Sequence, residues 1–358
     1  MQQPRWNRLI KPSSHRFFPF GATEWAFRID DDIALKFAKR ECDNPVCFQH
    51  ENDTYDILEK HEPSIYIAQS FVRVHIANLM PLMSGGSLEQ RIRGNQKLNN
   101  SGHLVEVTRK EPLHLVQRWA IELTGAVACL ESLGLVQGDL RPDNLLLDGN
   151  DPLKLADFDY ANSIGTRSDG NAPPWARVLG EEAGAATGSF GKNGAETEQF
   201  AIGSIIYNLT RGHRPYEGQV SGPDLVQRLL DMNFPELAGG RLDEITHRCW
   251  MGSYNTLKEL AEETAGLEGA IAQPRATVLD VEYTTKMRER CRRLLEEGLL
   301  AEAERILQRT MEAKWDDERY QDAENLNGYT CGKQAIDAAR SRVRNQDITS
   351  DARLSQWQ

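Results

Sequence analysis

The chain has 358 residues, of which 40% are apolar and 27% charged, and its formal net charge is -11. This length is enough for two or three compact units, and the acidic balance argues against binding to nucleic acid or an anionic membrane, because phosphate contacts need clustered Lys and Arg. We expect no membrane span and no secretory signal, since the apolar runs stay well short of about 20 residues. The six cysteines include no Cys-x-x-Cys pair, which predicts neither a zinc site nor a disulfide framework and favours a reducing compartment.

The first part of the chain has the pattern of short strands with one helix. Short apolar runs bounded by turn residues predict the strands, and the Asp30-Asp31-Asp32 turn between two of them predicts a hairpin. One segment instead carries apolar residues at helical spacing. The predicted strands cover residues 17–20, 25–29, 33–37, 71–74 and 77–83, and the predicted helix covers residues 45–60.

The pattern changes after Ser84-Gly85-Gly86 and becomes helical. Residues 113–133 predict a long amphipathic helix, and the nearly continuous apolar run at 200–209 predicts a buried helix. Between them, residues 161–197 are rich in Gly, Ala, Ser and Thr and predict a long loop, which at this length is usually functional.

The last part of the chain, from about residue 270, is charged and helical in pattern. Residues 287–311 predict one long helix, or two halves broken at Gly298. Two interpretations of this stretch remain open: it packs back on the preceding helical part, or it binds a partner.

Three polar residues stand at fixed intervals within apolar, strand-like runs. Asp139 is followed by Asn144 after five residues and by Asp157 after a further thirteen. This set provides one carboxylate that can accept the proton of an attacking hydroxyl, and an amide and a second carboxylate whose hard oxygen atoms suit Mg²⁺. Arg141 can bring positive charge to a transferring phosphoryl group. We therefore predict a phosphotransferase centred on these four side chains.

The segment Val136 to Asp148, with the strand Leu153-Lys-Leu-Ala-Asp-Phe-Asp159, resembles the catalytic loop and the metal-binding Asp-Phe-Gly motif of eukaryotic-type protein kinases. Other matches occur in the right order over about residues 17–265. The resemblance implies an α+β, bilobal protein kinase-like fold with a strand-rich N-lobe, a helical C-lobe and a C-terminal helical extension. The implied boundaries are 1–83 for the N-lobe and hinge, 84–268 for the C-lobe and 269–358 for the extension.

The segment Ile33-Ala34-Leu35-Lys36 resembles the strand whose lysine holds the α- and β-phosphates of ATP, and Glu51 resembles the helix glutamate that pairs with that lysine. The pairing also follows from geometry. Glu51 falls within an apolar helical stripe that includes Tyr55, and a carboxylate that is turned inward calls for a cation.

The segment from Met80 to Leu88 resembles the hinge that grips adenine. The carbonyl of Pro81 and the backbone of Met83 would bond the ring, and the missing N–H of proline is not needed there. Two apolar side chains would sandwich the ring, and one glycine remains of the usual phosphate loop. The residues implied to contact ATP or to support its binding are Gly21, Ala34, Lys36, Glu51, Met80, Pro81, Met83, Leu146 and Asp157.

The resemblance implies an ATP- and Mg²⁺-dependent protein kinase, and the order Asp139-Leu-Arg-Pro-Asp-Asn144 favours a Ser/Thr enzyme over a Tyr enzyme. Gln137-Gly138 replaces the usual His-Arg before the catalytic aspartate, which predicts a kinase of the non-RD type. Such a kinase does not need phosphate on its activation loop. Alanine substitutions at Thr166, Ser168, Thr187 and Ser189 should therefore leave its rate unchanged.

Two alternatives remain open at this point. The first is a pseudokinase that acts as a nucleotide-binding or scaffold module, and the second is a small-molecule phosphotransferase, which Gly138-Asp139 and Asp157-Phe-Asp159 fit. The expected partners are ATP, a protein substrate and a protein that binds the extension, with no nucleic acid and no membrane. The expected location is the cytoplasm, with the nucleus as the alternative.

Overall fold

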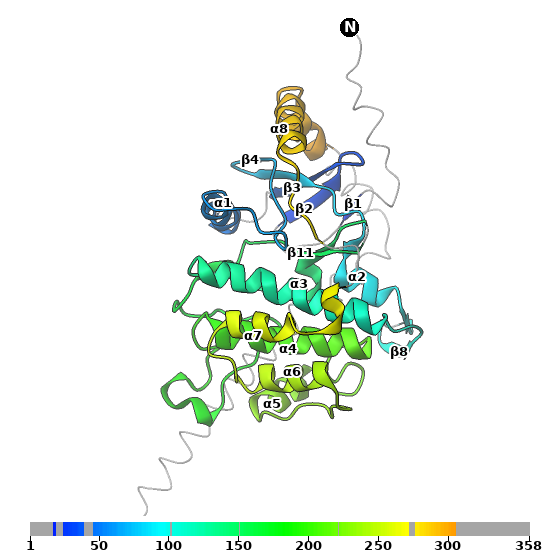
Figure 1. Ribbon diagram of the computed structural model, residues 1–358, viewed down its shortest axis with the longest axis vertical. Coiled ribbons are helices and arrows are strands. Elements are labelled where there is room, and N and C mark those ends of the chain that lie inside the picture. The colour runs from blue at the N-terminus through cyan, green and yellow to red at the C-terminus, as the bar shows by residue number, and fades with distance from the viewer. Residues whose placement is uncertain are drawn as a thin grey trace, which may run out of the picture. The chain divides into compact units, whose positions relative to one another are not determined.

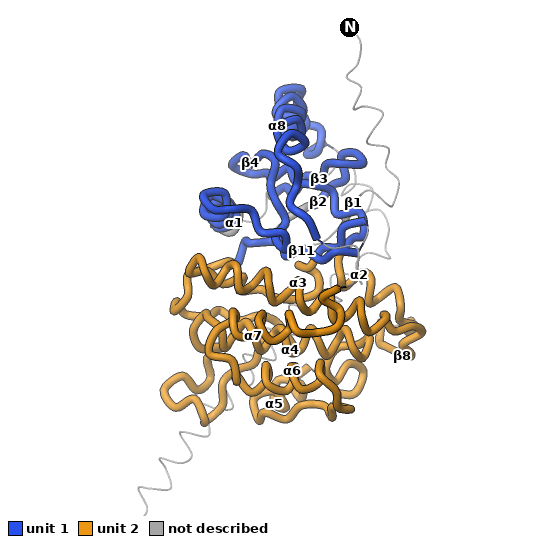
Figure 2. The backbone as a smooth tube through the Cα atoms, viewed as in Figure 1, with its two compact units in different colours: residues 1–86, 146–160, 274–326 blue, residues 87–145, 161–273, 327–358 orange. Residues whose placement is uncertain are grey.

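The computed structural model describes residues 17–18, 24–38, 46–100, 102–149, 151–220, 222–271 and 276–305. These residues form two compact units, each built from segments that are distant in sequence (Figure 2). The described residues of the small unit fall within Met1–Gly86, Leu146–Tyr160 and Pro274–Leu326. Those of the large unit fall within Ser87–Leu145 and Ala161–Gln273.

The small unit is built on a five-stranded antiparallel sheet with the order β1-β2-β3-β5-β4, accompanied by helices α1 and α8 (Figure 1). Strands β10 and β11 are neighbours in a second sheet. The bounds are β1 (Phe17–Phe18), β2 (Glu24–Arg28), β3 (Ile33–Ala38), α1 (Val46–Leu58), β4 (Val72–Val74), β5 (Ala77–Pro81), β10 (Leu145–Leu147), β11 (Leu153–Leu155) and α8 (Val281–Glu296).

The predicted hairpin is present between β2 and β3. Asp30 closes its turn, since the side-chain Oδ1 accepts hydrogen bonds from the backbone N–H of Asp32 at 2.8 Å and of Ile33 at 2.9 Å. The two strands then run antiparallel with Phe27 opposite Leu35. This register fixes which β3 side chains face each side of the sheet, because successive side chains alternate.

The large unit is mostly helical, and its longest helices α3 and α4 pack against each other and carry its core (Figure 1). Helix α3 buries Trp119, Leu123, Val127 and Leu130 at helical spacing, as the amphipathic pattern predicts. The bounds are α2 (Leu88–Arg93), β7 (Gln96–Leu98), β8 (Leu104–Val107), α3 (Leu113–Ser132), β9 (Leu135–Val136), η2 (Pro142–Asn144), β12 (Asn162–Ser163), η3 (Glu181–Ala186), α4 (Ala195–Arg211), α5 (Gly222–Leu230), α6 (Arg241–Trp250), α7 (Leu257–Thr264) and η4 (Glu268–Ile271). The short strand β6 (Gly86–Ser87) stands where the chain passes from the small unit to the large one.

The predicted long loop at 161–197 holds little regular structure, only β12, the 3-10 helix η3 and the first residues of α4. Strand β12 pairs with β9, with Asn162 opposite Val136. The start of this loop, which we call the activation segment (residues 161–194), is thereby joined to the strand that leads into the catalytic loop.

The compact units differ from the boundaries expected at residues 83 and 268. Residues 146–160 and the described part of the extension, 276–305, group with the small unit. The extension was predicted to be one long helix or two halves broken at Gly298, and the structure has the break. Gly298 adopts φ 92° between α8 and a further helical stretch at 299–305. The prediction that it packs on the helical lobe is wrong, since its buried side chains belong to the core of the small unit. No helix of the described residues is both long and apolar enough to cross a bilayer.

Candidate active site

Three charged side chains predicted to serve ATP meet in the small unit. Lys36 on β3 forms an ion pair with Glu51 on α1, and its Nζ also donates to Asp157 Oδ1 at 2.6 Å. Glu51 is 1% exposed, so the inward carboxylate inferred from the helical stripe has the cation that its burial requires. Asp157 follows β11 and adopts φ 63°, a left-handed conformation that is costly for a residue other than glycine.

A fourth residue of this cluster, Asn78 on β5, was not predicted from the sequence. Its Nδ2 donates to Glu51 Oε1 at 2.8 Å, and its Oδ1 accepts from the hydroxyl of Ser70 at 2.6 Å. Asn78 is fully buried, and it lies beside Lys36 because the two residues are register partners on β5 and β3. The available signal was a lone amide within the apolar run 77–83.

Helix α1 is held in place on its inner side by Tyr55, one turn after Glu51. The Tyr55 ring meets Phe158 edge to face at 5.3 Å between centroids, and the guanidinium of Arg73 lies 5.3 Å from the same ring. Arg73 also pairs with Asp56 at 2.5 Å. Burial, followed by the nearby charge of Glu51, raises the pKa of Tyr55 far above its usual range, so the phenol stays neutral.

The predicted adenine contacts form an apolar cluster in the small unit. Ala34 on β3 is the register partner of Met80 on β5, and both pack with Met83 and Leu146. Pro81 is buried at the end of β5. This group is apolar on one face of the sheet, as a flat heteroaromatic ring would require. The remaining predicted contact, Gly21, lies outside the described residues.

The predicted base and the predicted metal-binding amide meet in the large unit. Asn144 Nδ2 donates to both the backbone oxygen and the side-chain Oδ2 of Asp139, each at 2.9 Å. The amide NH₂ is therefore directed at Asp139, which leaves the amide oxygen as the group that could bind a cation. Arg141 donates from Nε to Asp143 Oδ2 at 2.9 Å, so its charge is held within the same loop.

The backbone of the predicted catalytic loop is hydrogen-bonded by the side chains of Gln137 and Glu198. Gln137 is fully buried, and its side-chain Oε1 accepts from the backbone N–H of Asp139 at 2.7 Å. Gly138 adopts φ 78°, where a side chain would add strain. Glu198 at the start of α4 accepts from the N–H of Gln137 at 3.1 Å and of Gly138 at 3.2 Å.

The carboxyl group of Glu198 is buried beneath this loop. Burial, together with the charge of Asp139, raises its pKa from 4.5 to about 7, although the two backbone N–H donors act in the opposite direction. The group that fixes the loop therefore gains or loses its proton near neutral pH.

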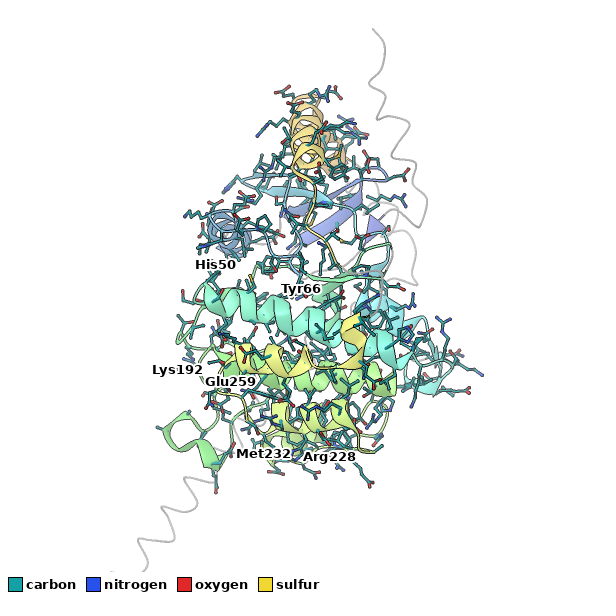
Figure 3. All side chains as sticks on the ribbon, viewed as in Figure 1. His50, Tyr66, Lys192, Arg228, Met232 and Glu259 are labelled. Atoms are coloured by element: carbon teal, nitrogen blue, oxygen red, sulfur yellow. The ribbon has the colours of Figure 1, made fainter. Side chains whose placement is uncertain are left out.

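A pocket in the large unit adjoins the catalytic loop. Its walls come from the activation segment, from α4 and from α6, and they include Gly138 and Leu140 on either side of Asp139. Lys192 and Met232, both labelled in Figure 3, also line it. The lining residues include four buried aromatic side chains: Trp175, Phe190, Phe200 and Trp250.

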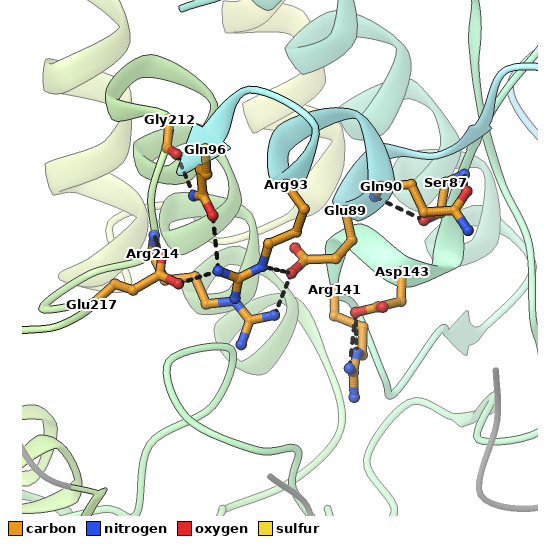
Figure 4. A network of polar contacts seen from close by, with 10 residues as sticks. All are labelled: Ser87, Glu89, Gln90, Arg93, Gln96, Arg141, Asp143, Gly212, Arg214 and Glu217. Atoms are coloured by element: carbon orange, nitrogen blue, oxygen red, sulfur yellow. Dashed lines mark hydrogen bonds and ion pairs between the residues drawn. The ribbon is translucent and has the colours of Figure 1, made fainter. Parts of the chain in front are cut away.

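A network of arginines and carboxylates occupies another part of the large unit, where α2 packs on η2 (Figure 4). Glu89 accepts from Arg93 at 2.8 Å and from Arg214 at 2.6 Å, and Arg93 also pairs with Glu217 at 2.5 Å. Arg141 and Asp143 form a separate pair in the same view. The carboxylates drawn here are thus each matched by an arginine of the chain itself.

The donors present suit a nucleotide-bound Mg²⁺ better than a metal held by protein alone. Among the described residues, no group of three His, Cys, Asp or Glu side chains could hold an ion. Mg²⁺ usually keeps several waters and takes one or two protein oxygens besides those of phosphates. The amide oxygen of Asn144 and the carboxylate of Asp157 match that requirement in kind.

The chain belongs to the protein kinase family, a family of phosphotransferases, because the model of the protein kinase domain matches residues 30–236. It is 28% identical over 212 residues to hormonally up-regulated neu tumor-associated kinase homolog B of Xenopus laevis, an alignment that covers 58% of this chain and 30% of that protein. It is 29% identical over 141 residues to CBL-interacting protein kinase 15 of Oryza sativa subsp. japonica, covering 39% of this chain and 30% of the relative.

A third relative is a cAMP-dependent protein kinase, catalytic subunit-like, of Caenorhabditis elegans, 26% identical over 149 residues that make up 41% of this chain and 32% of that protein. The chain thus aligns with about a third of the length of each of these three relatives. The matched kinase-domain model ends at residue 236, so the described part of the extension, 276–305, lies outside it.

Proposed function

We propose that the protein is an ATP- and Mg²⁺-dependent protein kinase that transfers the γ-phosphate to a Ser or Thr hydroxyl of a protein. The observation that carries this proposal is the paired charge set. Lys36 is joined to Glu51 and Asp157 in the small unit, and Asp139 is hydrogen-bonded to Asn144 in the large unit. Phosphoryl transfer needs mainly positioning and charge neutralisation, which is what such groups provide.

Each of these groups has a defined role in the proposal. Lys36, oriented by Glu51, holds the α- and β-phosphates, and Asn144 and Asp157 supply oxygen ligands to Mg²⁺. The bound ion neutralises charge on the phosphates. Asp139 orients the substrate hydroxyl and accepts its proton, and Arg141 adds positive charge near the transferred group.

A protein rather than a small molecule is the proposed substrate because of the pocket beside the catalytic loop. The pocket borders Gly138 and Leu140, on either side of Asp139, so a substrate side chain seated there would hold its polypeptide beside the catalytic loop. Aromatic walls suit a side chain of a polypeptide. A small-molecule phosphotransferase, the alternative, would use no such pocket.

Activity without activation-segment phosphate is part of the proposal. Gly138 provides no cation for such a phosphate, and two hydroxyl groups of the segment already donate within their own turns. Thr187 donates to the carbonyl of Gly184 at 2.7 Å, and Ser189 donates to that of Ala186 at 2.6 Å.

A cytoplasmic location, with the nucleus as the alternative, accords with the free thiols of Cys249 and Cys291.

The test is phosphate transfer from radiolabelled ATP by the purified full chain, measured beside Mg²⁺–ATP affinity. Asp139→Asn should lower the transfer rate by about 10²- to 10⁴-fold and leave the affinity nearly unchanged, because it removes the base and not the nucleotide contacts. The control is Asp169→Asn, an exposed position in the activation segment. Binding without transfer by the unsubstituted chain would establish the pseudokinase, and transfer to amino alcohols but not to proteins would establish the small-molecule enzyme.

A further inference from the structure

The five-stranded sheet of the small unit has two faces with different chemistry. Lys36 and Asn78 lie on one face, together with the apolar cluster around Ala34. The alternate residues of β3, Ile33 and Leu35, lie on the other face, where neither is exposed to solvent. The described side chains of this second face are apolar, so their burial requires a covering layer.

That cover is the chain's own extension. Met287 and Cys291 on α8 are 4% and 0% exposed, and Leu299 and Ala303 continue the contact after the break at Gly298. Figure 1 shows α8 alongside β3 and β4, within the unit drawn in one colour in Figure 2. The sheet residues that share this core are Phe27, Ile29, Ile33, Leu35, Phe37, Phe71, Ala77 and Leu79.

Polar contacts hold the extension near its start and at its middle. Arg290 on α8 reaches the β2–β3 turn, with ion pairs to Asp30 at 2.6 Å and Asp32 at 3.2 Å. Near the start of the extension, Lys154 on β11 donates to the carbonyl of Thr277 at 2.7 Å. Lys154 is 4% exposed, so this carbonyl helps to satisfy a buried charge.

The extension also touches the helix that carries Glu51. Arg288 on α8 lies 3.5 Å from Glu59, the residue after α1, and Glu59 pairs in turn with Arg73 at 2.7 Å. Arg73 lies over the ring of Tyr55. A continuous set of contacts therefore runs from the extension to the inner side of α1.

We propose that residues 276–305 form an intramolecular strap, a third layer that the small unit needs in order to hold Lys36 and Glu51 together. The occupant of the sheet's second face is this segment and not another protein, because the apolar stripe of α8 is already buried against it. Releasing the strap would expose one broad apolar surface and loosen the sheet and α1. The folded small unit thus extends beyond the matched residues 30–236.

The test compares two variants of the full chain by hydrogen–deuterium exchange. Cys291→Asp places a charge at a fully buried position of the strap, whereas Arg292→Ala, the control, changes the next residue, which is exposed. We expect Cys291→Asp to speed exchange by about tenfold or more in β2, β3 and β5, with α3 and α4 of the large unit unchanged. Equal exchange in the sheet of both variants, or the same loss in α3 and α4, would overturn the strap.

A milder variant covers the case in which Cys291→Asp prevents folding. Arg290→Ala removes both ion pairs to the β2–β3 turn but leaves the apolar contact, and it should raise the rate at which iodoacetamide labels Cys291 by several-fold. Labelling as slow as in the unsubstituted chain would count against the strap. These readouts need no nucleotide, so a chain that fails to bind ATP would refute the proposed function while exchange and labelling still decide the strap.

Discussion

Glu198→Gln should remove a pH dependence from the stability of the large unit. The pKa of Glu198 in the folded protein is about 7, above its ordinary value of 4.5, because the carboxyl group is buried. The folded state therefore holds the proton more tightly than the unfolded state. Its contribution to the free energy of unfolding is complete below about pH 4.5 and is lost as the pH rises through about 7.

The size of the effect follows from that interval. At about 1.4 kcal/mol per pH unit, the free energy of unfolding should fall by about 3 kcal/mol through this group, most of it between pH 5 and 8. Glutamine cannot ionise, yet its Oε1 can still accept from the N–H groups of Gln137 and Gly138. The variant should therefore lack this slope while the catalytic loop stays fastened.

The assay is urea denaturation at a series of pH values, followed by tryptophan fluorescence, to which the buried Trp119 and Trp250 of the large unit contribute. Glu196→Gln, two residues earlier and exposed, is the matched control and should keep the slope of the unsubstituted chain. The reasoning is refuted if Glu198→Gln and Glu196→Gln show the same dependence on pH.

Further substitutions test other parts of the protein. Tyr55→Phe should stabilise the small unit by about 1 kcal/mol in thermal denaturation, because the buried hydroxyl has no hydrogen-bond partner among the described residues; destabilisation would contradict this. Gly85→Ala should destabilise it by about 1–3 kcal/mol, since a Cβ would lie 2.8 Å from Leu147 Cβ, whereas Gly266→Ala, with its nearest atom at 3.4 Å, should be tolerated. Phosphotransfer assays should give unchanged rates for four alanine variants, and a collapse in rate would show that activation-segment phosphate is required: Thr166→Ala, Ser168→Ala, Thr187→Ala and Ser189→Ala.

Local patterns predicted the elements that carry the site. The apolar stripe through Tyr55 predicted α1 and turned Glu51 inward, and the Asp30-Asp31-Asp32 turn predicted the β2–β3 hairpin. These predictions succeed because helical and strand periodicities depend on neighbours in sequence. Asn144 meets Asp139 for the same reason, since both lie in one short loop.

Two supporting residues needed the structure to be understood. The sequence shows only that Gln137 stands where the kinase pattern has histidine. The structure adds that its buried side-chain amide oxygen accepts a hydrogen bond from the backbone N–H of Asp139. Asn78 bonds to Glu51, 27 residues away in the chain. Sequence spacing cannot give the direction of a side-chain amide or its distant partner, because both depend on how separate strands and helices pack.

The sequence by itself determined the family, the residue types of the phosphotransfer site and the amphipathic character of the extension, because motifs and periodicities are properties of short segments. Only the tertiary structure decided what the extension covers. The apolar stripe on α8 predicts that the helix is buried, but any apolar surface of matching shape could bury it. The apolar sheet face that α8 covers, and the acidic turn that receives Arg290, exist only once β2, β3 and β5 are paired.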